Sequence, residues 1–128
     1  MNLLLDTHAF LWMLFAPEKL SARVIQAHDD PVTTLHLSAV TLWEIQIKAA
    51  LGKLELDVPL AQIVREQVQD DRYRLLDIRA EHVLALDDLP RPHSDPFDRL
   101  LIAQSRVEGL PLVSADGVFA QYPVELFW

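Results

Sequence analysis

Two aspartates directly follow apolar, strand-like segments near the two ends of the chain. Asp6 comes after Leu3-Leu4-Leu5, and Asp116 comes just after Leu112-Val113-Ser114. In open parallel α/β sheets, ligands bind beyond the carboxyl ends of the strands, so the two carboxylates would face one crevice if their strands are neighbours. Aspartate is also common in turns and helix caps, which would explain either residue alone. Two acids at matching positions favour a functional site.

Three more acids lie in or next to expected helices. Glu44 stands four residues before Lys48, and a surface ion pair is the ordinary explanation for that spacing. Asp95 and Asp98 flank a proline at a helix start, where Asp95 can cap the helix and Asp98 can face the positive end of its dipole. The capping explanation is compatible with function, because a helix N-terminus can also aim Asp98 into the crevice.

A cluster of such carboxylates suits divalent-metal chemistry. Mg²⁺ and Mn²⁺ prefer oxygen ligands, and several carboxylates can hold one or two ions with coordination positions left open. These ions make water a better nucleophile and stabilise the charge that develops on a phosphodiester. The sequence offers no cysteine, no glycine-rich phosphate loop and no histidine pair at zinc-ligand spacing. We expect His8, His36 and His82 to be structural or surface residues.

The formal net charge of −8 has the wrong sign for a nucleic-acid binder, because affinity for phosphate normally comes from Lys and Arg. Cations bound by an acidic cluster would invert the local field and so weaken this objection. Four basic residues fall within one short stretch: Arg65, Arg72, Arg74 and Arg79. A solvated face is a more ordinary role for such a run than a binding groove.

Alternating strands and helices are expected to position these residues. Strands are expected at residues 2–5, 34–38, 74–78, 110–114 and 124–127. Helices are expected from a Thr7 cap to before Pro17, from a Ser21 cap through Ala27, at 40–51, from Pro59 through Val68, at 80–86, and from Pro96 to near Gly109. This alternation predicts an α/β fold with a mostly parallel central sheet covered on both faces, formed by one domain spanning 1–128.

The composition predicts a cytoplasmic protein. The absence of cysteine fits a reducing compartment. The apolar run at the N-terminus has no positive region before it and is too short for a signal peptide. No uncharged apolar stretch approaches the roughly 18 residues that a membrane span needs, so we expect no membrane association.

Four segments resemble the successive motifs of PIN domains, in the same order and spacing. They are Leu4–Trp12 (LLDTHAFLW), Ser38–Ile45 (SAVTLWEI), Asp95–Gln104 (DPFDRLLIAQ) and Leu112–Asp116 (LVSAD). Each motif alone is weak, but the four together are specific, and the similarity runs over essentially the whole chain. The closest resemblance is to the VapC-like branch, which forms the toxin half of bacterial toxin–antitoxin pairs.

The resemblance implies a three-layer fold, a Mg²⁺ or Mn²⁺ site, and RNA hydrolysis that leaves 5′-phosphate and 3′-hydroxyl ends. Asp6, Glu44 and Asp98 match the three core acids of the family, and Asp116 matches a fourth, more variable one. Three further residues would support these acids. Thr7 matches the hydroxyl residue after the first acid, and Ser114 stands where the family more often has Thr. Asp95 is an additional acid. The resemblance also implies a homodimer and a cognate antitoxin that inserts a segment near the acidic groove.

Other functions remain open on the residues themselves. A haloacid-dehalogenase-type phosphatase needs a second acid two residues after the first, where this chain has His8. A response-regulator receiver needs a phospho-accepting aspartate at the end of a central strand, where this chain has Leu37-Ser38. A non-catalytic protein that binds a metal or a partner through its acids, and a DNA-directed nuclease of the same fold, are the remaining alternatives.

Overall fold

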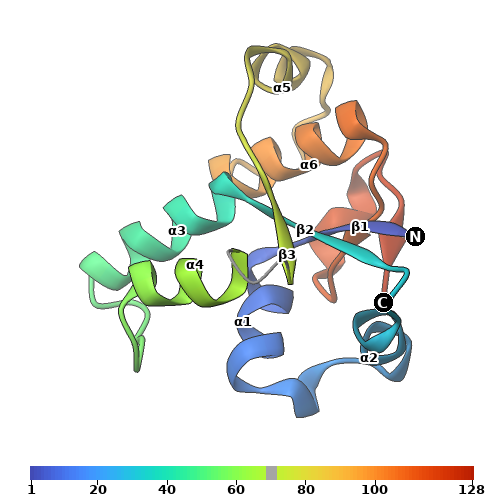
Figure 1. Cartoon of the computed structure of the whole chain (residues 1–128). Helices are drawn as coiled ribbons and strands as arrows, with labels where there is room; N and C mark the ends of the chain where they lie inside the picture. Colours follow the sequence, from blue (N-terminus) through green and yellow to red (C-terminus); the bar gives the residue numbers. More distant parts are fainter. Residues whose placement is uncertain (69–71) are drawn as a thin grey trace.

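In the computed structural model, which describes residues 1–68 and 72–128, five parallel strands form one sheet (Figure 1). The strand order is β3-β2-β1-β4-β5, and every pairing between neighbours is parallel. The strands are β1 (Asn2–Leu5), β2 (Thr34–Ser38), β3 (Tyr73–Leu76), β4 (Leu112–Val113) and β5 (Leu126–Phe127). The prediction of a mostly parallel α/β sheet is therefore confirmed.

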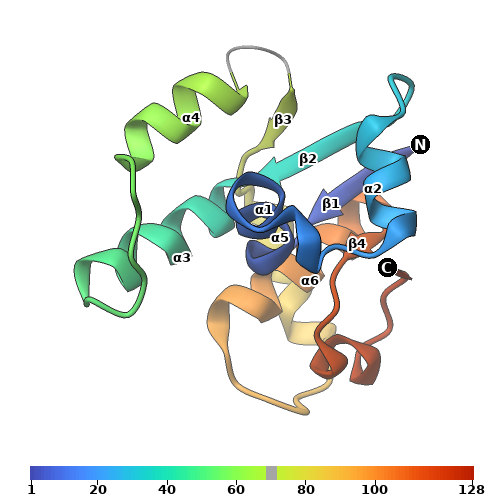
Figure 2. The same cartoon turned by 90° about the horizontal axis from the view of Figure 1, so that it is seen from below.

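Helices cover both faces of this sheet and give three layers. The helices are α1 (Thr7–Phe15), α2 (Ala22–Asp29), α3 (Ala39–Ala50), α4 (Leu60–Val68), α5 (Ala80–Leu84) and α6 (Pro96–Glu108), with 3-10 turns η1 (Pro17–Lys19), η2 (Ala85–Asp88) and η3 (Gly117–Gln121). Figure 1 shows α1, α2 and α4 on one side of the sheet, with α5 and α6 on the other. Helix α3 extends outward from the end of β2 (Figure 2).

The alternation of side chains along β1 explains the two layers of core. Leu3 and Leu5 pack into the cluster that contains Phe10 of α1. Leu4 points to the opposite face and packs into the cluster that contains Ile102 of α6. All three leucines are buried, as expected of a central parallel strand with helices on both faces.

The order of the strands decides where the acids lie. β4 returns beside β1, with Leu5 paired to Val113, so both strands end at the same edge of the sheet. The backbone amide of Asp6 donates to the carbonyl of Val113 at 3.1 Å. The condition under which Asp6 and Asp116 would share a crevice, neighbouring strands, is therefore met.

Several predicted boundaries are wrong by a few residues. The expected strands at 74–78, 110–114 and 124–127 begin or end elsewhere, and the expected helix at 80–86 is shared between α5 and η2. The cap of α1 is Asp6 rather than Thr7, because Asp6 has extended backbone and its carboxylate accepts the amide of Ala9 at 2.7 Å. The hydroxyl of Thr7 is thereby free to bind another helix.

The helix stops at two glycines are confirmed. Gly52 follows the end of α3 with φ of 72°, and Gly109 caps α6 with φ of 66°. Both values lie in the left-handed region, where a side chain is costly. Among the described residues, no helix combines the length and the apolar character needed to cross a membrane.

Candidate active site

Asp6 is a buried acid at the end of the central strand. Its side chain is only 4% exposed, and one carboxylate oxygen accepts the amide of Ala9. Burial raises the pKa of Asp6 to about 6, against the lowering effects of the Ser114 hydroxyl, the Ala9 amide and the nearby His8, while Asp98 raises it further. Burial disfavours the ionised form of a carboxylate, and a nearby positive charge would stabilise that form.

Glu44 is also buried, at 5% exposed, on the inner side of α3. The hydroxyl of Thr7 donates to its Oε1 at 2.6 Å, and Lys48 forms an ion pair with its Oε2. The ion pair that the spacing of Glu44 and Lys48 predicts is present. It is not an ordinary surface pair, because Glu44 is buried. The hydrogen bond and charge of Glu44 raise the pKa of Lys48.

Asp98 sits in the first turn of α6, as the capping explanation predicts. Asp95 caps the helix by accepting the amide of Asp98 at 2.9 Å. The carboxylate of Asp98 is bonded through Oδ2 to Nε2 of His93 at 3.0 Å. Burial raises the pKa of Asp98, the hydrogen bond from His93 lowers it, and the charges of Asp95 and Glu44 raise it.

Asp116 lies just beyond β4 and is exposed. Its carboxylate accepts the amide of Val118 at 3.0 Å, so it caps η3, and its own amide donates to the hydroxyl of Ser114. A hollow of about 220 Å³ is lined by Asp6 and Asp116 together with His8, Trp12 and Ala115. The capping role is real, and it leaves Asp116 at the edge of the same hollow as Asp6.

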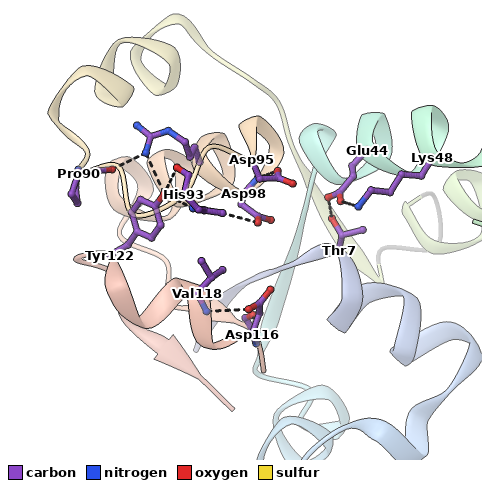
Figure 3. A network of polar contacts seen from close by, with 12 residues as sticks. Thr7, Glu44, Lys48, Pro90, His93, Asp95, Asp98, Asp116, Val118 and Tyr122 are labelled. Atoms are coloured by element: carbon purple, nitrogen blue, oxygen red, sulfur yellow. Dashed lines mark hydrogen bonds and ion pairs between the residues drawn. The ribbon is translucent and has the colours of Figure 1, made fainter. Parts of the chain in front are cut away.

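The predicted residues come from four parts of the fold and face a common region. Figure 3 shows Asp98 and Asp116 turned toward the same space, with Glu44, Lys48 and Thr7 on its other side. Asp98 and Asp6 act on each other's charge, as do Asp98 and Glu44. Within residues 1–68 and 72–128, however, no three of these acids bring ligand atoms within 4.8 Å of one another.

Comparison with known proteins identifies the family. The PIN domain family matches residues 3–125, almost the whole length. The chain belongs to the PIN domain family. None of the curated proteins matches the sequence.

Solved structures also have a similar fold over nearly the whole chain. VapBC2 from Rickettsia felis, bound to a DNA fragment from its promoter, has a TM-score of 0.73 at 16% identity, covering 100% of this chain and 99% of that chain. DNA-bound VapBC from Salmonella typhimurium has a TM-score of 0.72 at 15% identity, covering 98% and 96%. FitAcB from Neisseria gonorrhoeae has a TM-score of 0.65 at 20% identity, covering 100% and 97%.

The donors of this PIN domain fit a hard divalent cation. Asp6, Asp98 and Asp116 offer carboxylate oxygens, which Mg²⁺ and Mn²⁺ prefer. The raised pKa values of Asp6 and Asp98 show burial that a bound cation would compensate. Each oxygen of Glu44 has one partner, Thr7 or Lys48, and keeps a second lone pair, so Glu44 can contact a cation directly or through water.

Three polar residues of the PIN domain site were not singled out by sequence reasoning. His93 bonds Asp98, Tyr122 bonds His93, and Arg99 donates to Tyr122. His93 lies in a proline-flanked turn with no helical or strand period, so the only available signal was a lone histidine five residues before an acid. Lys48 was noted only as a partner for Glu44, although the charges of Asp95 and Asp98 also act on it.

The other expectations about basic residues have mixed outcomes. His82 is fully buried, as a structural residue would be, and His8 is exposed but lies close enough to Asp6 to lower its pKa. The arginines expected on a solvated face are all exposed: Arg65, Arg72, Arg74 and Arg79.

Proposed function

We propose that this PIN domain is a Mg²⁺- or Mn²⁺-dependent endoribonuclease and acts as the toxin of a toxin–antitoxin pair. The observation that carries the proposal is a pair of carboxylates, the buried Asp6 and the half-buried Asp98, whose pKa values desolvation raises. Ionised carboxylates that are shielded from water destabilise the fold unless a bound cation compensates their charge. Such perturbed acids are found mainly at the active sites of enzymes.

In this mechanism, Asp6 and Asp98 hold the principal ion and Asp116 helps to hold a second. When bound, the metal supplies positive charge that makes water a better nucleophile and stabilises charge on the phosphodiester. Thr7 and Lys48 orient Glu44 so that it binds water at the edge of the cluster. Ser114 supports Asp6, and Asp95 holds the first turn of α6 in place.

The neutralising partner is proposed to be a cognate antitoxin. The similar solved structures are of VapBC and FitAcB. A groove of about 530 Å³ is lined by Thr7 and Lys48, the two partners of Glu44, and by apolar side chains that include Leu11, Ile45 and Leu54. An apolar segment of a partner can lie in this groove. An arginine of that segment would pair with the carboxylates. We also propose that the protein acts in the cytoplasm as a homodimer.

The decisive experiment maps RNA 5′-monophosphate ends across the transcriptome after brief induction in a bacterium. The wild type is compared with the Asp6→Asn/Asp98→Asn double variant and with Asp87→Asn/Asp88→Asn, which changes two exposed acids of η2. We expect new ends at a few sites with the wild type and with the η2 variant, and none with the site variant.

Identical end profiles for all three soluble, folded proteins would contradict the ribonuclease. Metal-dependent cleavage of single- or double-stranded DNA by the purified wild type would then favour the DNA-directed nuclease. Metal or partner binding without any hydrolysis would favour the non-catalytic alternative.

A further inference from the structure

A chain of hydrogen bonds reaches Asp98 from outside the acid cluster (Figure 3). Nε2 of His93 lies 3.0 Å from Oδ2 of Asp98, and Nδ1 lies 2.6 Å from the hydroxyl of Tyr122. Arg99 donates through NH1 to that hydroxyl at 3.2 Å and to the carbonyl of Pro90 at 2.7 Å. The chain therefore joins α6, the turn that precedes it, and the segment that follows η3.

The outer members of this chain are rigidly placed. Arg99 and Tyr122 are both buried, and the guanidinium of Arg99 lies 5.9 Å from the centre of the Tyr122 ring. The rings of His93 and Tyr122 meet edge to face with their centres 5.3 Å apart. Buried polar groups that satisfy one another in this way favour a single arrangement, because losing one partner strands the others.

The hydrogen-bond partners determine which nitrogen of His93 carries a proton. The Tyr122 hydroxyl has one proton, which goes either to Nδ1 of His93 or to the carbonyl of His93, 3.4 Å away. The shorter contact, to Nδ1, favours the first case, in which Nδ1 accepts and the ring proton lies on Nε2. Nε2 then donates to the carboxylate of Asp98.

We propose that His93 is a positioning residue that orients Asp98 for metal binding, with Tyr122 and Arg99 fixing the imidazole. The donated hydrogen bond occupies Oδ2 and leaves Oδ1 of Asp98 for a cation. A metal ligand held from outside in this way binds more tightly, because its orientation is set before the ion arrives. The inference rests on the proposed function for its metal site, but it does not depend on which nucleic acid is cleaved.

The test measures the Kd for Mn²⁺ from the electron paramagnetic resonance signal of free Mn²⁺, using the full chain. We expect His93→Ala to raise the Kd by about 10- to 100-fold, the range typical for loss of such a supporting contact. His93→Gln should stay close to the wild type, because its amide can donate from the place of Nε2. Tyr122→Phe should raise the Kd by a smaller factor.

Two matched variants control for loss of the same groups elsewhere. Tyr73→Phe removes the hydroxyl of a buried tyrosine that donates to the sulfur of Met13, and His28→Ala removes an imidazole in the exposed contact with Arg72. Both should keep the wild-type Kd for Mn²⁺. In a folded His93→Ala protein, a Kd equal to that of the wild type overturns the inference, as does a wild type that binds no Mn²⁺.

A spectroscopic measurement separates positioning from bulk structural support. Long-range proton–nitrogen correlation spectra of the Mg²⁺-loaded protein should show His93 protonated at Nε2, and an unprotonated Nε2 would overturn the inference. A wild type that binds Mn²⁺ more tightly than His93→Ala but cleaves no RNA supports the inference while refuting the ribonuclease.

Discussion

The fold contains two groups of acidic and histidine side chains, and they differ in whether hydrogen bonds and ion pairs already satisfy their polar atoms. In the first, on α5 and α6, the ligand atoms of Glu81, His82 and Glu108 lie within 4.8 Å of one another. In the second, the candidate active site, Asp6 and Asp98 do not meet that closely with any third acid among the described residues. Proximity alone would favour the first group as the metal site.

The hydrogen bonds of the first group argue against a metal there. Nδ1 of the buried His82 accepts the amide of Arg79 at 3.0 Å, so the proton lies on Nε2, which is 2.8 Å from Glu108. A metal on Nε2 would move that proton to Nδ1, where it would face another donor. Glu81 is already paired with Arg79. The group is complete without a cation, whereas burial leaves Asp6 and Asp98 with raised pKa values.

The largest effect that follows from this difference is on cleavage. We expect Asp6→Asn or Asp98→Asn to lower metal-dependent cleavage by at least about 1000-fold, since metal ions supply several kcal/mol of transition-state stabilisation and each tenfold is about 1.4 kcal/mol. The matched variant Glu108→Gln keeps an acceptor for His82 and should cleave at the wild-type rate. Initial rates on purified RNA check this, and an inactive but folded Glu108→Gln would reverse the comparison.

The second effect is on stability and should mark His82 as structural. His82→Ala removes a fully buried imidazole and strands the Arg79 amide and Glu108, so we expect a loss of about 2–4 kcal/mol in the free energy of unfolding. His28→Ala, which changes a half-buried imidazole that contacts Arg72 at the surface, should cost far less. Urea unfolding in the presence of a chelator measures both, and equal losses would count against a structural His82.

The third effect has the opposite sign and concerns Asp6. The pKa of Asp6 is raised from 3.8 to about 6 in the folded protein, so the folded chain holds more protons than the unfolded chain between those values. The free energy of unfolding of the metal-free protein should therefore fall as pH rises from about 4 to 6. Asp6→Asn removes this cost, keeps the cap of α1, and should stabilise the metal-free protein by about 1–3 kcal/mol at pH 7.

Chemical unfolding at pH 4 and pH 7 tests the sign. The gain in Asp6→Asn should be present at pH 7 and nearly absent at pH 4, where Asp6 of the wild type is protonated when folded. Mg²⁺ should raise the melting temperature of the wild type and not of the variant. A metal-free Asp6→Asn protein less stable than the wild type at pH 7 would show that burial of Asp6 is already compensated.

Much of the frame was predictable because local signals agree with the fold. Gly52 and Gly109 end α3 and α6 at the expected places, and the apolar run before Asp6 forms the central strand. The sequence predicts that Asp6 and Asp116 lie close together only if their strands are neighbours, because the positions of strand ends do not reveal the order of strands in the sheet. The last two strands, β4 and β5, are shorter than expected and pair with each other over only two residues.

The wrong details of the site all depend on contacts across the fold. Glu44 is buried because Thr7 of another helix meets it, which no spacing within α3 reveals. The sequence predicts Thr7 as the cap of α1, but the preceding residue, Asp6, caps the helix by accepting the amide of Ala9. His93 could not be tied to Asp98 from the sequence, because the partner that holds its other nitrogen, Tyr122, lies 29 residues away.

The smallest effect is on how metal affinity depends on pH. With a pKa of about 6, Asp6 is ionised at pH 7 and must release a proton to bind metal at pH 5. Competition at Asp6 alone should raise the Kd for Mg²⁺ about tenfold between pH 7 and pH 5, and the raised pKa of Asp98 adds to this. Calorimetry at the two pH values, in buffers of different ionisation enthalpy, also counts the protons released.

The Glu108→Gln variant provides the control for this last measurement. It alters the closely spaced group and leaves Asp6 and Asp98 in place, so its Kd should depend on pH as that of the wild type does. If the dependence disappears in Glu108→Gln and persists in Asp6→Asn, the ion binds at α5 and α6 after all. In that case Nε2 of His82 is able to give up its proton, and satisfied hydrogen bonds do not protect that group from a metal.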